Sequence, residues 1–552
     1  MEIINDNFRF QRRLDILKQR KLEQIKEKLE KEGPLNEDDY GRVVPPVDAW
    51  KPIPNHRDGH FYGMDGWLEN FTSLMEHHPV YIDPNDAFAG RWMYFMSRMT
   101  NKWNPDYSYV HLQGNIDKYN IICGIGDDAH FAPDYEMGVS LGWSGLLKKI
   151  AFYEEKYAND QEKKKFYESH RQIIQSIQVW IRHHIERIES MIGEEADTEL
   201  RQNLEEMLET NRKVLNDAPT TLREACQWII WYHLASRTYN RDGAGGQIDT
   251  LLQPFYEKDL REGTIDHDKA VYYLACFLIN DPIYWQLGGP DENGDDQTSD
   301  ISFLILEAGD KINTSLNITV RVHPKLNKEL FRQSLSYLIK NKNAWPRFSG
   351  DKALVEGFMK NGFDAKLARK RIAVGCNWMS LPGLEYTMND LVKVNIAKVF
   401  EVALQDMREH SEVGKYSTST LYIVFMDHLC RAVHTAAEGI RFHLKNQKYN
   451  EPELVLNLLS HGPLEKGLDV SDGGATYYNL AIDGAGLAIA ADSFAAIEQR
   501  IEREGKLSWQ MLFAVLDTNF ASEEGKRIQR LLQNSAKYGQ GQTVADEWAG
   551  KI

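Results

Sequence analysis

Residues 371–390 read RIAVGCNWMSLPGLEYTMND and hold a single cysteine, Cys376, between two signals of local structure. The short apolar run Arg371-Ile372-Ala373-Val374 predicts a strand, and Pro382-Gly383 predicts the turn that closes the segment. A lone cysteine is most often a small buried hydrophobe. Nucleophilic catalysis would need a nearby His or Lys to lower the thiol pKa, and the local sequence has neither. A one-electron role, in which the S–H bond itself reacts, fits these surroundings better.

Outward from this loop, helical stretches alternate with short β-branched segments. The run Ile318–Val322 predicts a second strand. Apolar residues at helical spacing predict long helices over 61–100, 134–157 and 160–214. Helices alternating with short buried strands indicate an α/β fold with a barrel-like core.

The N-terminal sixty residues have a different composition from the rest. Residues 7–32 predict an exposed amphipathic helix with Leu14, Leu17, Leu22, Ile25 and Leu29 on one side. Residues 33–60 are rich in Pro, Gly and Asp, which predicts an extended connector laid over a core. We therefore expect two parts, residues 1–60 and residues 61–552.

Composition narrows the possible functions. The chain has 552 residues, 42% of them hydrophobic, so it can bury a large core. Its formal net charge of −16, without a long basic run beyond residue 30, argues against binding to nucleic acid or an anionic membrane. Small-molecule chemistry or protein association is favoured.

Cysteine usage and apolar runs bear on the cellular location. The five cysteines, at positions 123, 226, 276, 376 and 430, form no CxxC pair and predict free thiols in a reducing compartment. The N-terminus has no apolar signal region, and eighteen consecutive apolar residues occur nowhere. These patterns predict a soluble, cytoplasmic protein. Without an HExxH, CxxC or EF-hand pattern, we also predict no metal site.

The cysteine loop and seven other blocks resemble, in order, the glycyl radical enzymes, the family that includes pyruvate formate-lyase and the glycerol and choline enzymes. The resemblance extends over residues 78–546. Beside GCNWMSLPG and the helix NIAKVFEVALQDM, the blocks are residues 79–92, 130–146, 218–265, 317–331, 345–362, 473–501 and 516–541.

The resemblance implies a ten-stranded α/β barrel of two half-barrels, wrapped by helices, with the cysteine loop inside. In the family a second loop, with a glycine in an RVxGY-like motif, meets that cysteine. Here the only RV dipeptides are Arg42-Val43 and Arg321-Val322, and neither continues to the motif. We therefore expect a barrel that is incomplete in this chain. We favour a smaller glycyl-radical-bearing subunit, charged by a radical SAM activating enzyme, in an oligomeric assembly. The alternatives are a non-radical relative and a shortened chain.

The residues near the loop bear on the reaction. Many family members that eliminate water or an amine carry a Glu two residues after the radical cysteine, where this chain has Trp378. An indole offers a wide apolar face, so we expect a flat or hydrophobic substrate group, unless Trp378 only packs under the loop. Pyruvate formate-lyase has two adjacent cysteines, and this loop has one, so acyl transfer between sulfurs is not expected.

Polar candidates come from the same resemblance. Matching Gly246–Asp249 to a GRxDQ element places Arg241 to hold a carboxylate or phenolate and Asp242 to act as acid or base. Their alternative is a surface salt bridge. Gly243 and Gly245, in place of bulkier residues, are expected to leave room for a larger substrate.

Three weaker candidates complete the set. His130 has a side chain suited to proton transfer, although a helix-cap role accounts for it equally well. Arg321 and Asp351 follow in segments that the family turns inward, where substrate binding and barrel packing are not separable by sequence.

The sequence thus predicts a thiyl-radical-bearing large subunit that abstracts hydrogen from a small organic substrate at Cys376. The alternative is a non-radical homologue that uses the same barrel for ligand binding or for polar lyase or hydrolase chemistry through His130, Asp242 and Arg241.

Overall fold

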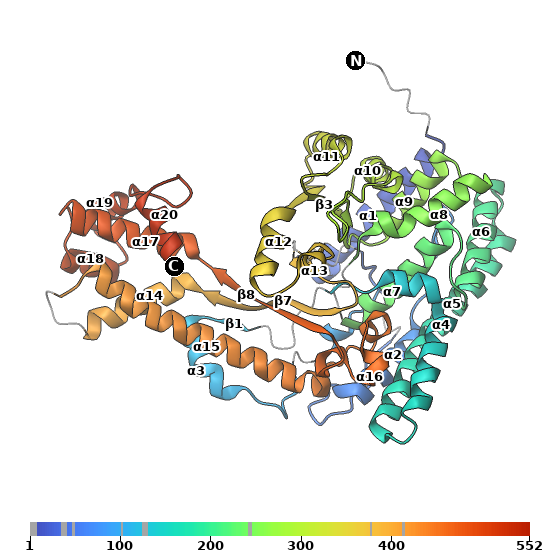
Figure 1. Ribbon diagram of the computed structural model, residues 1–552, viewed down its shortest axis with the longest axis horizontal. Coiled ribbons are helices and arrows are strands. Elements are labelled where there is room, and N and C mark those ends of the chain that lie inside the picture. Colours follow the sequence, from blue (N-terminus) through green and yellow to red (C-terminus); the bar gives the residue numbers. More distant parts are fainter. Residues whose placement is uncertain are drawn as a thin grey trace, which may run out of the picture. The chain divides into compact units, whose positions relative to one another are not determined.

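The chain forms two compact units in the computed structural model (Figure 1). The structure describes residues 8–34, 41–46, 50–100, 103–123, 131–240, 245–375, 378–410 and 415–552. Unit 1 comprises residues 1–104, 128–389 and 446–479, and unit 2 comprises residues 105–127, 390–445 and 480–552. The division at residue 60 expected from the sequence stays a prediction.

Unit 1 combines long helices with short strands. Its helices are α1 (Gln11–Glu32), α2 (Gly63–His77), α4 (Tyr135–Lys156), α5 (Gln161–Glu194), α6 (Thr198–Val214), α7 (Leu222–Asn240), α8 (Ile248–Glu262), α9 (His267–Asn280), α10 (Asp300–Ile312), α11 (Lys328–Asn341), α12 (Asp351–Lys360), α13 (Ala365–Arg369) and α16 (Pro463–Lys466). Its strands are β2 (Tyr284–Leu287), β3 (Asn317–Val322), β4 (Arg347–Gly350), β5 (Ile372–Val374) and β6 (Trp378–Ser380). Strands β7 (Glu385–Asn395) and β8 (Tyr477–Ala485) begin in unit 1 and end in unit 2.

The centre of unit 1 is a parallel sheet in the order β2-β3-β4. Helix α10 connects β2 to β3 and α11 connects β3 to β4, which is the crossover that parallel strands require. Ile318 and Val320 on one face belong to the main hydrophobic core, whereas Thr319 and Arg321 point to the opposite face. The sheet therefore has one apolar and one polar face, and the polar face is available to build a site.

Tryptophans fill much of the core between the helices of unit 1. Trp143 and Trp228 lie with ring centroids 4.9 Å apart, and Trp180 and Trp231 lie 5.1 Å apart. These pairs join α4 and α5 to α7, and α5 packs against both α4 and α6 (Figure 1). Aromatic side chains of this size contribute much of the apolar area that stabilises a fold.

Helix α1 differs from the expectation of a solvated amphipathic helix. It packs against α9 and α10 and buries Leu14 and Leu17. The expected apolar stripe does not continue, because Leu22 is 49% exposed while Lys21 and Lys28 are buried. Burial lowers the pKa of the Lys21 ammonium well below its usual value, and the group donates to the carbonyl of Asn280.

The remaining helix predictions are confirmed in part. Helix α4 matches the expected 134–157, and the expected 160–214 divides into α5 and α6 at Asp197, which caps α6. The prediction over 61–100 is wrong beyond His77, where α2 ends. Pro79 lies two residues further on, and a proline disfavours helical geometry in the residue before it, here His78, which is extended.

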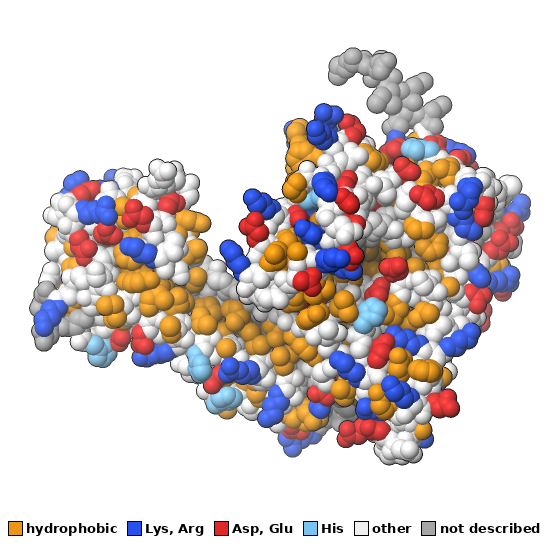
Figure 2. Space-filling model, in the orientation of Figure 1, with side chains coloured by type: hydrophobic (Ala, Val, Ile, Leu, Met, Phe, Trp, Pro, Cys, Tyr) orange, Lys and Arg blue, Asp and Glu red, His pale blue; other side chains and the backbone are white. Residues whose placement is uncertain are grey.

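Unit 2 is mainly helical. Its elements are α3 (Gln113–Tyr119), β1 (Ile122–Cys123), α14 (Ile396–His410), most of α15 (Thr418–Asn450), α17 (Leu487–Ile497), α18 (Trp509–Asp517), α19 (Glu523–Gln533) and α20 (Val544–Lys551). Strand β1 pairs with the end of β7 in the sheet β1-β7-β8. Strand β8 is an edge strand and exposes Tyr478 and Ile482, and hydrophobic side chains are visible along it in Figure 2.

Cys226 and Cys276 are buried free thiols and Cys430 is an exposed one, as expected for these three. Among the described helices, none has the length and apolarity needed to span a membrane.

Candidate active site

The predicted cysteine loop lies between the two strands of a hairpin. Strand β5 pairs antiparallel with β6, with Ile372 opposite Ser380 and Val374 opposite Trp378. Gly375 follows β5 with a φ of +52°, a left-handed backbone that glycine adopts without a Cβ penalty. Cys376 itself lies outside the described residues. The strand predicted at 371–374 is confirmed as β5.

The polar face of the parallel sheet supplies the groups that meet this hairpin. Gln286 of β2, Thr319 of β3 and Arg347 of β4 are neighbours in register across the three strands. Arg321 lies two residues further along β3 and is opposite Ser349. Because side chains alternate along a strand, these residues share the face opposite the apolar core.

Three of these side chains, Gln286, Arg321 and Arg347, bind the backbone of residues 371–375, and we call them the side-chain bracket. Arg321 Nη1 donates to the carbonyl of Arg371. Gln286 Oε1 accepts from the Ala373 N–H at 2.8 Å, and Arg347 Nη2 donates to the Gly375 carbonyl at 3.2 Å.

The positions bound by the bracket follow from strand geometry. Backbone N–H and C=O groups of alternate residues point to the same edge of a strand. The backbone groups of Ile372 and Val374 face β6, so the backbone groups of residues 371, 373 and 375 face the opposite edge of β5. Side chains of the parallel sheet thus take the place of a neighbouring strand and hold the segment that leads into Cys376.

Arg321 and Asp351, predicted separately from the sequence, lie together. Arg321 Nε donates to Asp351 Oδ1 at 2.8 Å, and both side chains are buried. Burial lowers the pKa of the Arg321 guanidinium, and the Asp351 carboxylate opposes that shift. This contact fits the packing interpretation of the pair, and direct substrate binding by either residue stays a prediction.

A second buried ion pair holds the hairpin from the side of β7. Arg371 Nη1 donates to Glu385 Oε2 at 2.6 Å, and its guanidinium lies 3.8 Å from the ring centroid of Phe358. Glu385 Oε2 also accepts from the Leu381 N–H at 3.2 Å. The carboxylate therefore fixes both the start of β5 and the turn after β6.

Arg347 is a site residue that the sequence reasoning missed. Its guanidinium lies 5.2 Å from the ring centroid of Tyr284, and its Nε is enclosed without a hydrogen-bond partner among the described residues. The available signal was alternation, because Phe348 packs against the core and Arg347 must therefore face the other way.

Trp378 begins β6 and packs against Ala132, Ile372 and Val374. Its indole N–H is buried and has no partner in the part of the chain that the structure describes. The contacts fit the packing interpretation, and a contact between Trp378 and substrate stays a prediction.

The other polar candidates, His130, Arg241 and Asp242, lie outside the described residues, as does Gly243. Gly245, which follows them, corrects one expectation. A Cβ added there would stand 1.7 Å from the carbonyl oxygen of Tyr284, so this glycine allows the chain to pass close to β2 and leaves no extra room for substrate.

A cavity of about 350 Å³ borders the turn after β6. Its lining includes Asp134 and Tyr135 at the start of α4, Gln247 before α8, and Pro382. The His461 imidazole meets the Asp134 carboxylate at 2.7 Å. The cavity is formed by segments that adjoin the predicted site residues in sequence, which makes it a candidate part of the substrate space.

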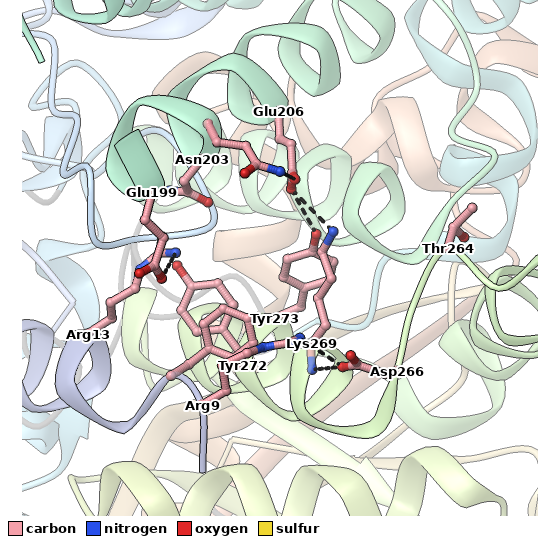
Figure 3. Close-up of a pocket in the computed structure, with 12 residues that line it drawn as sticks. Arg9, Arg13, Glu199, Asn203, Glu206, Thr264, Asp266, Lys269, Tyr272 and Tyr273 are labelled. Carbon is pink, nitrogen blue, oxygen red and sulfur yellow. Dashed lines mark hydrogen bonds and ion pairs between the residues drawn. The ribbon is translucent and has the colours of Figure 1, made fainter. Parts of the chain in front are cut away.

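A second cavity, of about 470 Å³, lies between α1, α6 and α9 (Figure 3). Its charges are already paired, with Arg9 bound to Asp266 and Lys269 near Glu206. None of its lining residues belongs to the hairpin or to β2, β3 and β4. We therefore place the candidate active site at the hairpin.

Comparison with known proteins shows the family and the fold of the chain. The family described as pyruvate formate lyase-like matches residues 120–552. (2S)-3-sulfopropanediol dehydratase of Klebsiella oxytoca is 23% identical over 474 residues, which cover 76% of this chain and 55% of the relative. Trans-4-hydroxy-L-proline dehydratase of Clostridioides difficile is 25% identical over 406 residues, which cover 66% of this chain and 50% of the relative. The chain thus spans little more than half the length of these relatives.

The likeness extends to solved structures. A glycyl radical enzyme from Archaeoglobus fulgidus superimposes with a TM-score of 0.78 at 20% identity, covering 88% of this chain and 73% of the other. The α/β barrel class predicted from the sequence is confirmed by this likeness.

Proposed function

The chain belongs to the pyruvate formate-lyase-like family, as its sequence blocks predicted, and we propose that it is the thiyl-radical-bearing large subunit of a glycyl radical enzyme. Its relatives include dehydratases that act on small organic molecules. In this proposal Cys376 abstracts hydrogen from a small organic substrate in the cytoplasm of an anaerobic cell.

The observation that carries the proposal is the way the strand before Cys376 is held. The side-chain bracket fixes residues 371, 373 and 375 from one edge, and β6 pairs with residues 372 and 374 from the other. A structural thiol does not require such support, whereas hydrogen transfer depends on the placement of the reacting atom.

The proposed steps balance without a consumed oxidant. A glycyl Cα radical takes the hydrogen of the Cys376 thiol, which leaves a thiyl radical and a closed-shell glycine. The thiyl radical takes hydrogen from a substrate C–H bond and becomes a thiol again. After rearrangement or elimination, the product radical takes that hydrogen back, and the thiyl radical regenerates the glycyl radical.

The source of the glycyl radical is part of the proposal. An RVxGY-like motif does not occur within the 552 residues. We assign it to a smaller polypeptide, which a radical SAM enzyme activates. Coexpression with the genomic neighbours under anaerobic conditions tests this assignment, because the smaller protein is expected to copurify with the chain. Activation of a longer form of the same chain, without a second protein, would contradict it.

The role of Cys376 can be tested without knowing the substrate. After activation, the glycyl radical is expected to give a doublet in electron paramagnetic resonance. Thiol hydrogens exchange with water, so repeated transfer between glycine and Cys376 in D₂O should replace the glycine α-hydrogen and collapse the doublet. Cys376→Ser is expected to keep the doublet in D₂O and to lose turnover, because a hydroxyl hydrogen is bound too strongly to be transferred.

Cys430→Ser is the matched control, since Cys430 is a free thiol exposed on unit 2, and it should behave like the unchanged protein. Turnover in air, without an activating enzyme, or by Cys376→Ser would instead support the polar lyase or hydrolase alternative.

A further inference from the structure

Among the described residues, the charges around β5 do not balance. Three guanidinium groups, from Arg321, Arg347 and Arg371, surround the strand, and two carboxylates accompany them. Asp351 pairs with Arg321, and Glu385 pairs with Arg371. Of these described groups, the one without a carboxylate partner is Arg347, which binds the carbonyl of Gly375 at the end of the strand.

The guanidinium of Arg347 is held in place but makes few hydrogen bonds among the described residues. Nη2 donates to the Gly375 carbonyl at 3.2 Å, and the group lies over the ring of Tyr284 with Cζ 5.2 Å from the centroid. Nε is enclosed without a partner among the described residues. No described carboxylate lies within ion-pair distance of the group, in contrast to Arg321 and Arg371.

Such a group is prepared for an anion. Arginine stays charged in proteins, and an enclosed N–H without a partner is unfavourable. The planar donors of a guanidinium match the oxygens of a carboxylate or sulfonate, and hydrogen bonds to an ionised partner are stronger than neutral ones. Because the group is fixed beside the residue that precedes Cys376, an anion bound to it would lie at the reaction site.

We propose that Arg347 is an anion-binding residue and that the substrate carries a carboxylate or sulfonate group. This inference rests on the proposed function, which places the reaction at Cys376, and it names the class of substrate. It differs from a purely positioning role, in which Arg347 would only hold the Gly375 carbonyl and no ligand anion would contact it.

Calorimetric titration of the unactivated 552-residue protein tests the inference without radical chemistry. The probes are propionate and propionamide, which have nearly the same shape and differ in charge, together with methanesulfonate. In low-salt buffer free of carboxylates, propionate and methanesulfonate should bind at least about tenfold more tightly than propionamide, since a hydrogen bond to a charged group is the stronger kind.

Arg347→Gln should abolish this preference for the anion, and Arg347→Lys should keep part of it, because the charge remains while the planar donors are lost. Arg332→Gln is the control, since Arg332 is a 73% exposed arginine on α11, and it should bind like the unchanged protein. Thermal denaturation of each variant shows whether it is folded.

Equal binding of propionate and propionamide by the unchanged protein, or no detectable binding of propionate, would overturn the inference even if Arg347→Gln failed to fold. An anion preference that survives in folded Arg347→Gln would overturn it as well. If the doublet of the activated, unchanged protein persisted in D₂O while the anion preference remained, the proposed function would be refuted and the anion-binding role of Arg347 would stand.

Discussion

The two units of the chain place their charged groups differently. Unit 1 contains guanidinium–carboxylate pairs that lie inside, such as Arg371 with Glu385, whose side chains are 1% and 0% exposed. In unit 2, the bidentate pair of Arg408 with Asp517 lies at the surface, with exposures of 32% and 51%. The helices of unit 2 also meet through aromatic contacts, such as Phe494 stacked 4.5 Å from Trp548.

The difference indicates what the charges do. A buried ion pair is a poor source of stability, because removing two charges from water offsets much of their attraction. It is directional, however, and in unit 1 these pairs fix one hairpin and the strand before Cys376. The buried pairs of unit 1 therefore serve geometry at the site, whereas the Arg408–Asp517 pair of unit 2 lies at the surface.

Lowering the pH should reveal the largest difference in stability between the units. Burial lowers the pKa of His78 and His170 to about 4 and that of His184 to about 3, and all three lie in unit 1. In the unfolded chain these histidines bind protons near pH 6.5. The contribution of the neutral, buried histidines to the stability of the fold is therefore complete above that pH and is lost as the pH falls toward 4. By pH 4 each histidine should lower the free energy of unfolding by roughly 3 kcal/mol, at about 1.4 kcal/mol per pKa unit.

The measurement is amide hydrogen exchange between pH 7 and pH 4.5, corrected for the intrinsic pH dependence of exchange. Protection in α5 of unit 1 should fall more steeply than protection in α14 of unit 2. An equal loss of protection in the two helices would contradict the expected difference between the units.

Glu385→Ala should have the next largest effect. The change leaves the Arg371 guanidinium buried without a carboxylate, which costs about 3–5 kcal/mol. Urea unfolding followed by tryptophan fluorescence reports mainly on unit 1, because only Trp509 and Trp548 of the thirteen tryptophans lie in unit 2.

The matched control replaces both partners, as Glu385→Leu with Arg371→Met, and should recover much of the loss because no buried charge remains unpaired. A double variant as unstable as Glu385→Ala would show that the hairpin depends on the hydrogen bonds of the pair and not on charge balance.

Arg408→Ala in unit 2 should have the smallest effect. Exposed ion pairs add little to stability and are screened by salt. Hydrogen exchange in α14 and α18 is expected to change barely at low salt and not at all in 1 M NaCl. A large, salt-independent loss of protection would place this pair with the buried ones of unit 1.

Local pattern was sufficient to predict several elements of the fold. Periodicity and β-branched runs located α4, the strand over Ile318–Val322 and the strand before Gly375. The same pattern failed beyond His77, because apolar spacing continues there through a segment that contains Pro79 and packs without a helix.

The site was harder to predict, because its contacts depend on register. Arg321 and Asp351 were both expected to face inward, but that they pair with each other follows only from the alignment of β3 with β4. Gln286 and Arg347 carry no motif, and their importance appears only once the parallel sheet and the hairpin are seen together. Residues far apart in the chain reach β5 through side chains, and single-sequence patterns do not encode such contacts.

The side-chain bracket has a consequence for how this site can evolve. Two strands joined by backbone hydrogen bonds keep a spacing of roughly 4.8 Å whatever their sequence. Strand β5 is instead bound by the side chains of Gln286, Arg321 and Arg347, so its distance from the parallel sheet depends on the lengths of those three side chains. Single substitutions at these three positions can therefore change the distance or tilt of β5 relative to the parallel sheet while the surrounding barrel stays unchanged.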